Sequence, residues 1–220
     1  MRSFGILDIV GPRMIGPSSS HTAGAARLAY VAGHIAGYGA NFVRFILYHS
    51  FKYTAKGHGT DRALLAGVMG MPPDDDRLRD AFRIADDRGL KYEFITSDDD
   101  VPHANTARIQ IYKNDFLLAD IVGASIGGGN VLITNINGIE VELTGEYPTL
   151  IVRHYDAHGV IAEVTGALAD DQINIAFMRV YRQSKGNEAY MIIETDQKVP
   201  HKTLSHIAGL RPEIAEVFAI

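Results

Sequence analysis

Residues 149–175 read TLIVRHYDAHGVIAEVTGALADDQINI, and this stretch decides the fold of the C-terminal part of the chain. The apolar run 149–155 predicts a strand, and the apolar spacing of 159–171 predicts an amphipathic helix. Gly159 permits a sharp turn between them, and a helix that begins near Val160 offers free backbone N–H groups to a carboxylate. The stretch therefore predicts a strand, a tight turn and a helix whose first turn suits a small anion.

The residues that follow complete a compact unit. Strands are expected at 173–183 and 188–197, with the turn SKGN between them, then a helix at 201–210 and a last strand at 213–220. The order strand, helix, strand, strand, helix, strand is the ferredoxin-like βαββαβ plan. Near Tyr147 the sequence changes from segments separated by glycine-rich polar loops to a regular order of strands and helices. We therefore predict two domains, residues 1–147 and 148–220.

The N-terminal part predicts a mixed α/β domain, so the fold class of the whole chain is α+β. Alternating or continuous apolar residues indicate strands at 41–48, 90–96, 107–113, 116–126, 130–138 and 139–145. Apolar residues at helical spacing indicate helices at 25–37, 59–70 and 75–89, the last ending in Gly89.

Composition excludes several classes of protein. The chain has 220 residues, 46% of them hydrophobic, which is enough for a proper core, and its net charge is −5. No basic run marks a nucleic-acid surface, and no apolar stretch approaches the roughly 20 residues of a membrane span. The first residues lack the apolar core of a signal peptide, so we expect a cytoplasmic protein without nucleic-acid or membrane partners.

Cysteine is absent from the sequence. The chain alone therefore has no disulfide, no cysteine nucleophile and no thiolate-ligated metal centre. A metal site made of histidines is disfavoured, because no HxxxH or HxH pair occurs. We expect no metal ligand in this chain.

Residues 155–175 resemble the opening of an ACT domain, a small-molecule sensing module of amino-acid metabolism. In that family an Asp-x-x-Gly-Val turn joins the first strand to the helix, and an effector, often an amino acid, commonly lies near it at an interface between two modules. The resemblance implies effector-binding residues, which in this sequence are Asp156, Gly159, Val160, Asn174 and Ile175. The structural alternative is that the aspartate only caps the helix and the glycine only turns the chain. Many members have Arg-Pro after the aspartate where this chain has Ala-His, so the effector stays open.

Four motifs in order carry a second resemblance: GPSSSHTAGAAR (16–27), SFKYTAKGHGTDRAL (50–64), PHANTARI (102–109) and ASIGGGNV (124–131). Followed by TGEYPTLIV, they are similar to the β chain of the iron–sulfur L-serine dehydratases over essentially the whole sequence. The resemblance implies a lyase that converts L-serine to pyruvate and ammonia, with a [4Fe–4S] cluster held by the cysteines of a separate α chain. It also implies a hetero-oligomer, and the lack of cysteine agrees with that division of labour.

The chemistry of dehydration suggests roles for the polar residues. A base that titrates near neutral pH must take the α-proton of serine, which favours histidine. We expect His58, which lies between two glycines, to be the base, and His21 to be a second acid/base group or a carboxylate-orienting donor. The run Ser18, Ser19, Ser20 and Thr22, placed before a helix expected to start near Ala23, predicts an anion pocket for the substrate carboxylate. The other substrate-binding candidates are Lys56, Asn105, Thr106, Ser125, Gly127 and Gly128.

Two alternatives stay open at this point. The serine run can be a plain helix cap, and the glycines can be plain turns. The whole chain can also be a regulatory protein that binds an amino acid without converting it, because the N-terminal part looks like the allosteric substrate-binding domain of some phosphoglycerate dehydrogenases. The pairing of His21 with His58 favours a catalytic partner subunit over that alternative.

Overall fold

The computed structural model describes residues 13–37, 39–145 and 147–220, and residues 1–12, Tyr38 and Glu146 lie outside this description. The chain forms two compact units. The first runs to Asn137 and includes Glu142–Thr144, and the second consists of Gly138–Val141 and Gly145–Ile220. The expected boundary at residue 147 stays a prediction.

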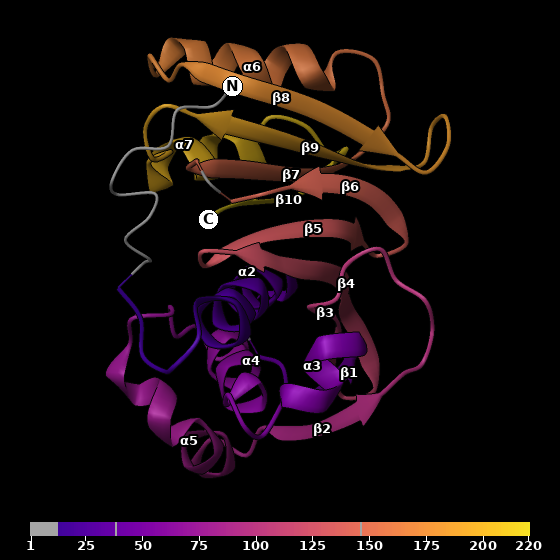
Figure 1. Ribbon diagram of the computed structural model, residues 1–220. Coiled ribbons are helices and arrows are strands. Elements are labelled where there is room, and N and C mark those ends of the chain that lie inside the picture. Colours follow the sequence, from indigo (N-terminus) through magenta and orange to yellow (C-terminus); the bar gives the residue numbers. More distant parts are fainter. Residues whose placement is uncertain (1–12, 38, 146) are drawn as a thin grey trace. The chain divides into compact units, whose positions relative to one another are not determined.

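The first sheet has six strands in the order β2-β1-β3-β4-β5-β6 (Figure 1). Its strands are β1 Phe42–Leu47, β2 Lys91–Thr96, β3 Thr106–Lys113, β4 Phe116–Gly127, β5 Asn130–Ile136 and β6 Ile139–Leu143. β1 and β2 run parallel, whereas β1–β3, β3–β4 and β4–β5 are antiparallel. The helical elements of this part are a turn at Ser19–Gly24, α2 Ala25–Ala36, α3 His49–Thr54, α4 Thr60–Val68, a 3₁₀ turn at Asp76–Asp80, and α5 Ala81–Asp87.

Helix α2 is the centre of the first unit. It packs on β3, β4 and β5 and on α4, so it is buried on several sides and is rich in alanine. Gly67 of α4 lets the two helices approach closely, because a side chain there would collide with the backbone of Ala26. The N-terminal end of α2, where the serine run lies, is thereby fixed on a rigid element.

The local structure differs from expectation at two places. The helix expected at 75–89 is divided, because Asp75 caps a 3₁₀ turn by accepting the Arg77 N–H at 2.9 Å, and the α-helix begins only at Ala81. The helix α3, six residues that begin at His49 directly after the strand expected at 41–48, was not expected at all. A helix of that length is too short to give a periodic pattern in the sequence.

The second unit has the expected ferredoxin-like order. Its elements are β7 Thr149–Tyr155, α6 Val160–Asp170, β8 Ile175–Arg182, β9 Glu188–Thr195, α7 His201–Ala208 and β10 Ile214–Ala219. The antiparallel sheet has the order β10-β7-β9-β8. The predicted α+β fold class, with a βαββαβ unit at its C-terminal end, is confirmed.

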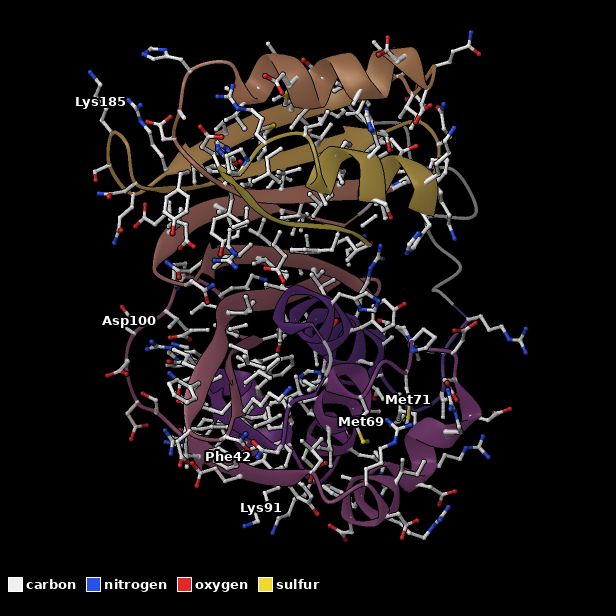
Figure 2. The ribbon with its side chains drawn as sticks, turned by 180° about the vertical axis from the view of Figure 1, so that it is seen from behind. Phe42, Met69, Met71, Lys91, Asp100 and Lys185 are labelled. Carbon is white, nitrogen blue, oxygen red and sulfur yellow. The ribbon has the colours of Figure 1, made fainter. Side chains whose placement is uncertain are left out.

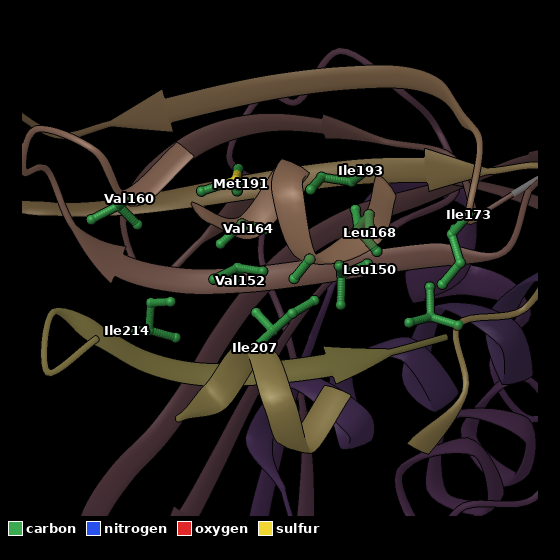
Figure 3. Packing of buried hydrophobic residues seen from close by; sticks show 12 residues of the cluster. Leu150, Val152, Val160, Val164, Leu168, Ile173, Met191, Ile193, Ile207 and Ile214 are labelled. Atoms are coloured by element: carbon green, nitrogen blue, oxygen red, sulfur yellow. The ribbon is translucent and has the colours of Figure 1, made fainter. Parts of the chain in front are cut away.

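The core of this unit lies between its sheet and its two helices. Figure 3 shows side chains of β7 and β9, such as Leu150 and Ile193, facing Val164 and Leu168 of α6 and Ile207 of α7. All five are fully buried, and burying each such side chain contributes about 1.5–3 kcal/mol to stability. Leu150 and Val152, which lie two residues apart on β7, both belong to this core, as side chains on one face of a strand do. Among the described residues no helix is both long and apolar enough to cross a membrane.

Candidate active site

The serine-rich run forms the first turn of a helix. Ser18 is extended (φ −137°, ψ 125°), and its hydroxyl accepts a hydrogen bond from the His21 N–H at 3.0 Å, as an N-cap residue does. The Ser18 carbonyl accepts from Thr22 N (3.0 Å) and Ala23 N (3.2 Å), which widens Ser19–Gly24 into a π-helical turn. The expectation that the run precedes a helix starting near Ala23 was wrong, because the capped run is itself helical and continues into α2.

His21 projects from this turn into a partly buried cluster. Its Nε2 lies 2.8 Å from the Ser50 hydroxyl and its Nδ1 lies 3.3 Å from the Ser18 hydroxyl. The ring centroid is 5.1 Å from that of His58, and Phe51 meets the ring by its edge. Burial, and then the neighbouring His58, lower the pKa of His21 below its ordinary value. Both effects favour the neutral imidazole, which is the form that can accept a proton.

His58 lies in the glycine turn before α4. Gly59 has φ 68°, in the left-handed region that favours glycine, and it is the N-cap residue of α4. The buried Thr22 hydroxyl donates a hydrogen bond to the His58 carbonyl at 2.9 Å and so ties the turn to the serine run. The His58 side chain itself is exposed. The structure thus brings the two histidines together and leaves the His58 ring accessible to a ligand.

The other two motifs join the same cluster. Ser50 N donates to the Ala104 carbonyl at 2.9 Å, which connects the loop between β2 and β3 to α3. Figure 2 marks this loop by Asp100. Asn105 and Ser125 exchange two hydrogen bonds, Ser125 N to Asn105 O at 3.0 Å and Asn105 Nδ2 to Ser125 O at 3.4 Å. Ser125 in turn packs on Gly24, where any side chain would collide with its hydroxyl. The four motifs therefore form a closed ring of contacts, although they are far apart in the sequence.

The predicted substrate-binding residues differ in how much hydrogen-bonding capacity they keep. The Thr106 hydroxyl is occupied by the His103 carbonyl at 2.6 Å. The Ser125 hydroxyl is fully buried and has no hydrogen-bond partner among the described residues. Gly127 ends β4 with φ 102° and Gly128 follows in the turn to β5 with φ 62°, and both conformations favour glycine. An unpaired buried hydroxyl costs about 1–3 kcal/mol, which makes Ser125 the member of this set most in need of a partner.

A pocket of about 570 Å³ lies beside His58. Its cationic side chains are Lys56, Arg62 and Arg79, and none of them forms an ion pair with a carboxylate in the part of the chain that the structure describes. Phe82 lies under the Arg62 guanidinium at 5.9 Å. The full lining is Ile15, Gly16, Pro17, Thr22, Lys56, Gly57, His58, Gly59, Asp61, Arg62, Leu78, Arg79 and Phe82.

Sequence reasoning found Lys56 but missed the two arginines. Arg62 follows the KGHGTD turn on the first turn of α4, so its place in that motif is a signal that could have been used. Arg79 lies on the 3₁₀ turn Asp76–Asp80, far from every quoted motif, and no sequence signal indicates it. A pocket with one histidine and three cations suits a small molecule with a carboxylate.

The predicted effector residues of the second unit contact other residues of that unit. The Asp156 carboxylate accepts hydrogen bonds from Gly186 N at 3.1 Å and Arg182 Nη1 at 2.8 Å, and these two donors lower its pKa. The alternative in which Asp156 caps α6 was wrong, because its carboxylate is bound to the β8–β9 hairpin. Asn174 donates to Asp196 Oδ2 at 2.6 Å. Ile175 begins β8, and Val160 is buried in the core of the unit.

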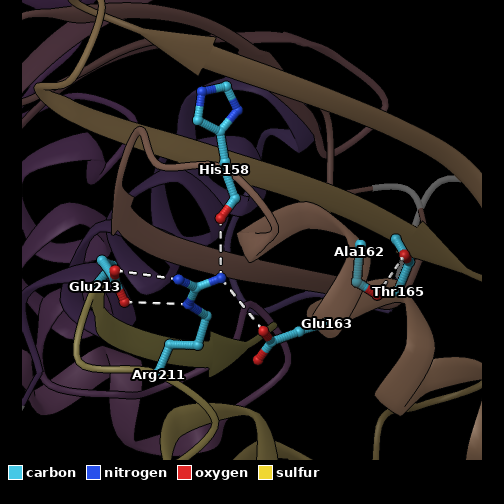
Figure 4. Close-up of polar contacts among 6 residues, drawn as sticks. All are labelled: His158, Ala162, Glu163, Thr165, Arg211 and Glu213. Atoms are coloured by element: carbon cyan, nitrogen blue, oxygen red, sulfur yellow. Dashed lines mark hydrogen bonds and ion pairs between the residues drawn. The ribbon is translucent and has the colours of Figure 1, made fainter.

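Arg211 contacts the residues at the start of α6. Arg211 donates to the His158 carbonyl at 2.9 Å and to Glu163 Oε1 at 3.3 Å, and it pairs with Glu213 (Figure 4). Gly159 has φ 91°, and a Cβ there would lie 2.7 Å from Arg211 Nη1. The glycine is thus required both by the turn and by the arginine. Its role in binding an effector stays a prediction.

The side chains that could bind a metal ion do not cluster in the part of the chain that the structure describes. Among the described residues no three His, Asp or Glu side chains gather as a metal site requires, and the sequence has no cysteine. The side chains of this chain do not fit a [4Fe–4S] cluster, whose irons are held mainly by thiolates. Such a cluster would have to be bound entirely by another chain.

Comparison with known proteins assigns the family. The family model "Serine dehydratase beta chain" matches residues 6–136, which is more than half of the chain. The chain belongs to the serine dehydratase beta chain family. The ACT domain model matches residues 148–211, so the ACT resemblance of the second unit is confirmed.

Full-length relatives agree with this assignment. The chain is 41% identical to a protein of Bacillus subtilis called "Probable L-serine dehydratase, beta chain", over 100% of this chain and 99% of that one. It is 39% identical to the "L-serine dehydratase, beta chain" of Peptoniphilus asaccharolyticus, over 96% and 95% of the two chains. This chain is also 29% identical to a "D-3-phosphoglycerate dehydrogenase" of Bacillus subtilis, over 71% of this chain and 30% of the length of that protein.

Proposed function

We propose that this chain is the β subunit of an L-serine dehydratase and that it supplies acid/base and substrate-binding groups to a reaction that gives pyruvate and ammonia. The observation that carries the proposal is that the four motifs contact one another in a ring that includes the adjacent pair His21 and His58, beside a cationic pocket. A binding protein without catalysis has no need of two adjacent imidazoles.

The reaction defines what these groups must do. Loss of the α-proton and of the β-hydroxide from serine gives an enamine, which tautomerises to an imine, and water hydrolyses the imine to pyruvate and ammonia. His58, exposed at the pocket wall, takes the α-proton. His21, whose neutral form is favoured and whose ring centroid is 5.1 Å away, acts as the second acid/base group.

The substrate carboxylate is held in the pocket by cations. Arg62 and Arg79 present planar guanidinium groups that suit a carboxylate, and Lys56 adds a third positive charge. Asp61 is the acidic member of the lining, and its carboxylate accepts a hydrogen bond from the backbone N–H of Arg62 at 2.7 Å. The serine run, Asn105 and Ser125 are the further substrate-binding candidates, and they belong to the ring of motif contacts that includes the two histidines.

The departing hydroxide needs an electrophile, and the described residues hold no cluster of side chains that could bind a metal ion for this purpose. We propose that an α chain provides it as a [4Fe–4S] cluster ligated by its own cysteines, and that the two chains form a hetero-oligomer. The ACT unit regulates the assembly by binding an amino-acid effector near Asp156 and Gly159.

Reconstitution tests the proposal. The chain purified alone should show no dehydratase activity and no cluster absorption band after anaerobic treatment with iron and sulfide, because it has no thiolate. Mixed with a cysteine-bearing serine dehydratase α chain, it should form pyruvate from L-serine, measured with a coupled lactate dehydrogenase assay.

The contrary outcomes are distinct. A stable cluster on the isolated chain would contradict the division of labour between the chains. A chain that binds L-serine tightly, associates with the α chain and still yields no pyruvate would favour the regulatory, non-catalytic alternative.

A further inference from the structure

Ser50 is the polar partner of His21 that the proposed roles leave unused. It is the second residue of α3, and its hydroxyl lies 2.8 Å from His21 Nε2, a shorter distance than the 3.3 Å between Ser18 Oγ and Nδ1. Both distances are within the range of hydrogen bonds, and the contact with Ser50 has the ideal length.

The backbone around Ser50 is held on several sides. Its N–H donates to the Ala104 carbonyl at 2.9 Å, and its carbonyl accepts the Thr54 hydroxyl at 2.7 Å. His49, immediately before it, has φ 38°, a left-handed conformation that costs a residue with a Cβ about 1–3 kcal/mol. The chain turns sharply here between β1 and α3, and this turn presents the Ser50 hydroxyl to His21.

The hydrogen-bond roles around the ring are complementary. The Ser18 oxygen already accepts the His21 N–H, so its own O–H is free to donate to Nδ1. Nε2 then carries the ring proton and donates it to Ser50 Oγ. If both hydroxyls rotate, the other tautomer is equally satisfied. The ring proton can therefore lie on Nδ1 or on Nε2 while the ring keeps the same position.

We propose that Ser50 is a positioning residue that holds the imidazole plane of His21 against His58 by a hydrogen bond at Nε2. The ring is held at both nitrogens, and it stays at 30° to the His58 ring with 5.1 Å between the centroids. The structural part of this proposal stands by itself, whereas its effect on turnover rests on the proposed function.

The structural part can be tested on the full chain without a partner. In ¹H–¹⁵N correlation spectra of the histidine ring nitrogens, the His21 signals are assigned by their loss in His21→Gln. Ser50→Ala should shift the Nε2 signal and change the tautomer ratio, and Ser50→Thr, which keeps the hydroxyl, should restore both. The apparent pKa of His21 should fall further in Ser50→Ala, because the imidazolium has two N–H donors and loses one acceptor.

Ser205→Ala is the matched control. Ser205 lies 3.3 Å from His201 Nδ1 on the exposed surface of α7, so its loss should leave the His21 signals unchanged. Unchanged His21 signals in Ser50→Ala would overturn the proposal, and so would a shift that Ser50→Thr does not reverse. A thermal melt of each variant separates ring repositioning from loss of the fold.

The functional part uses the reconstituted two-chain enzyme. Ser50→Ala should lower kcat by up to about 10²-fold with little change in KM, since a displaced general acid/base costs turnover rather than binding. Ser50→Thr should recover most of kcat. If the wild-type enzyme forms no pyruvate, the proposed function fails while the NMR result still decides the role of Ser50. If wild type is active and Ser50→Ala keeps normal kcat, the positioning of His21 by Ser50 does not matter for turnover and the proposal is wrong.

Discussion

The loops around His58 and the loops around Asp156 differ in whether their charged side chains have ion-pair partners. Near His58 the three cations of the pocket have no ion-pair partner among the described carboxylates, and the Ser125 hydroxyl of the same ring of motifs is buried without a hydrogen bond. Near Asp156 the charges are compensated within the unit, by Arg182 for Asp156 and by Glu213 for Arg211. The difference indicates that the first region has cationic side chains available to a ligand, whereas the charged side chains of the second hold its own loops together.

His58→Ala should give the largest effect. Turnover of the reconstituted enzyme should fall by about 10²–10⁴-fold, the usual range for loss of a general base. His158→Ala, at an exposed histidine of the Asp-x-x-Gly turn in the second unit, is the control and should change turnover little. Pyruvate formation under saturating L-serine measures both. Near-normal turnover in His58→Ala would transfer the base role to His21 and remove the main contrast between the two regions.

Gly159→Ala should destabilise the second unit by about 1–3 kcal/mol, because the residue has φ 91° and its new Cβ would press on Arg211. Gly166→Ala is the matched control, since it lies within α6 with no atom in the way of a Cβ. That change should stabilise the helix by about 0.5–1 kcal/mol. Urea unfolding followed by circular dichroism gives both values. Equal stabilities of the two variants would mean that the Asp-x-x-Gly turn is not a constrained element.

Arg79→Ala should raise the KM for L-serine roughly tenfold and leave kcat nearly unchanged, as expected for loss of one charge-assisted contact at an exposed site. Arg83→Ala is the control. Arg83 lies on α5 and forms exposed ion pairs with Asp80 and Asp87, and it is not part of the pocket lining. An unchanged KM in Arg79→Ala would show that this cationic side chain of the pocket does not bind the substrate.

Asp156→Asn should give the smallest effect, visible only in the pH dependence of stability. The pKa of Asp156 is lowered in the folded state by the Gly186 N–H and by Arg182, so its contribution is present above the unfolded value, which is about 4, and is lost as the pH falls through the lower folded value. Wild type should be more stable than Asp156→Asn at pH 6, and the gap should close toward pH 2. Urea midpoints across this pH range measure it, and a constant gap would mean that Asp156 acts by shape alone.

The ferredoxin-like unit could be predicted almost completely from the sequence, because its elements are local. Each strand and helix has its own apolar period, and Gly159 marks the turn by the one conformation that other residues avoid. The errors occurred where the sequence carries no period, as in the six residues of α3, or where a cap changes the kind of helix, as at Asp75. His58 and His21 could be found as candidates because histidine between glycines or hydroxyls is unusual in a purely structural loop.

The sequence by itself determined the α+β class, the order of elements in the second unit, the absence of thiolates and the short list of polar motifs. Only the tertiary structure decided which of these meet: that His21 contacts Ser50, that Ser125 packs on Gly24, and that Arg79 reaches the pocket beside His58. The physical reason is that periodicity and turn chemistry act over a few neighbouring residues. The geometry of a site is set instead by how a sheet and its helices pack, which joins residues many positions apart.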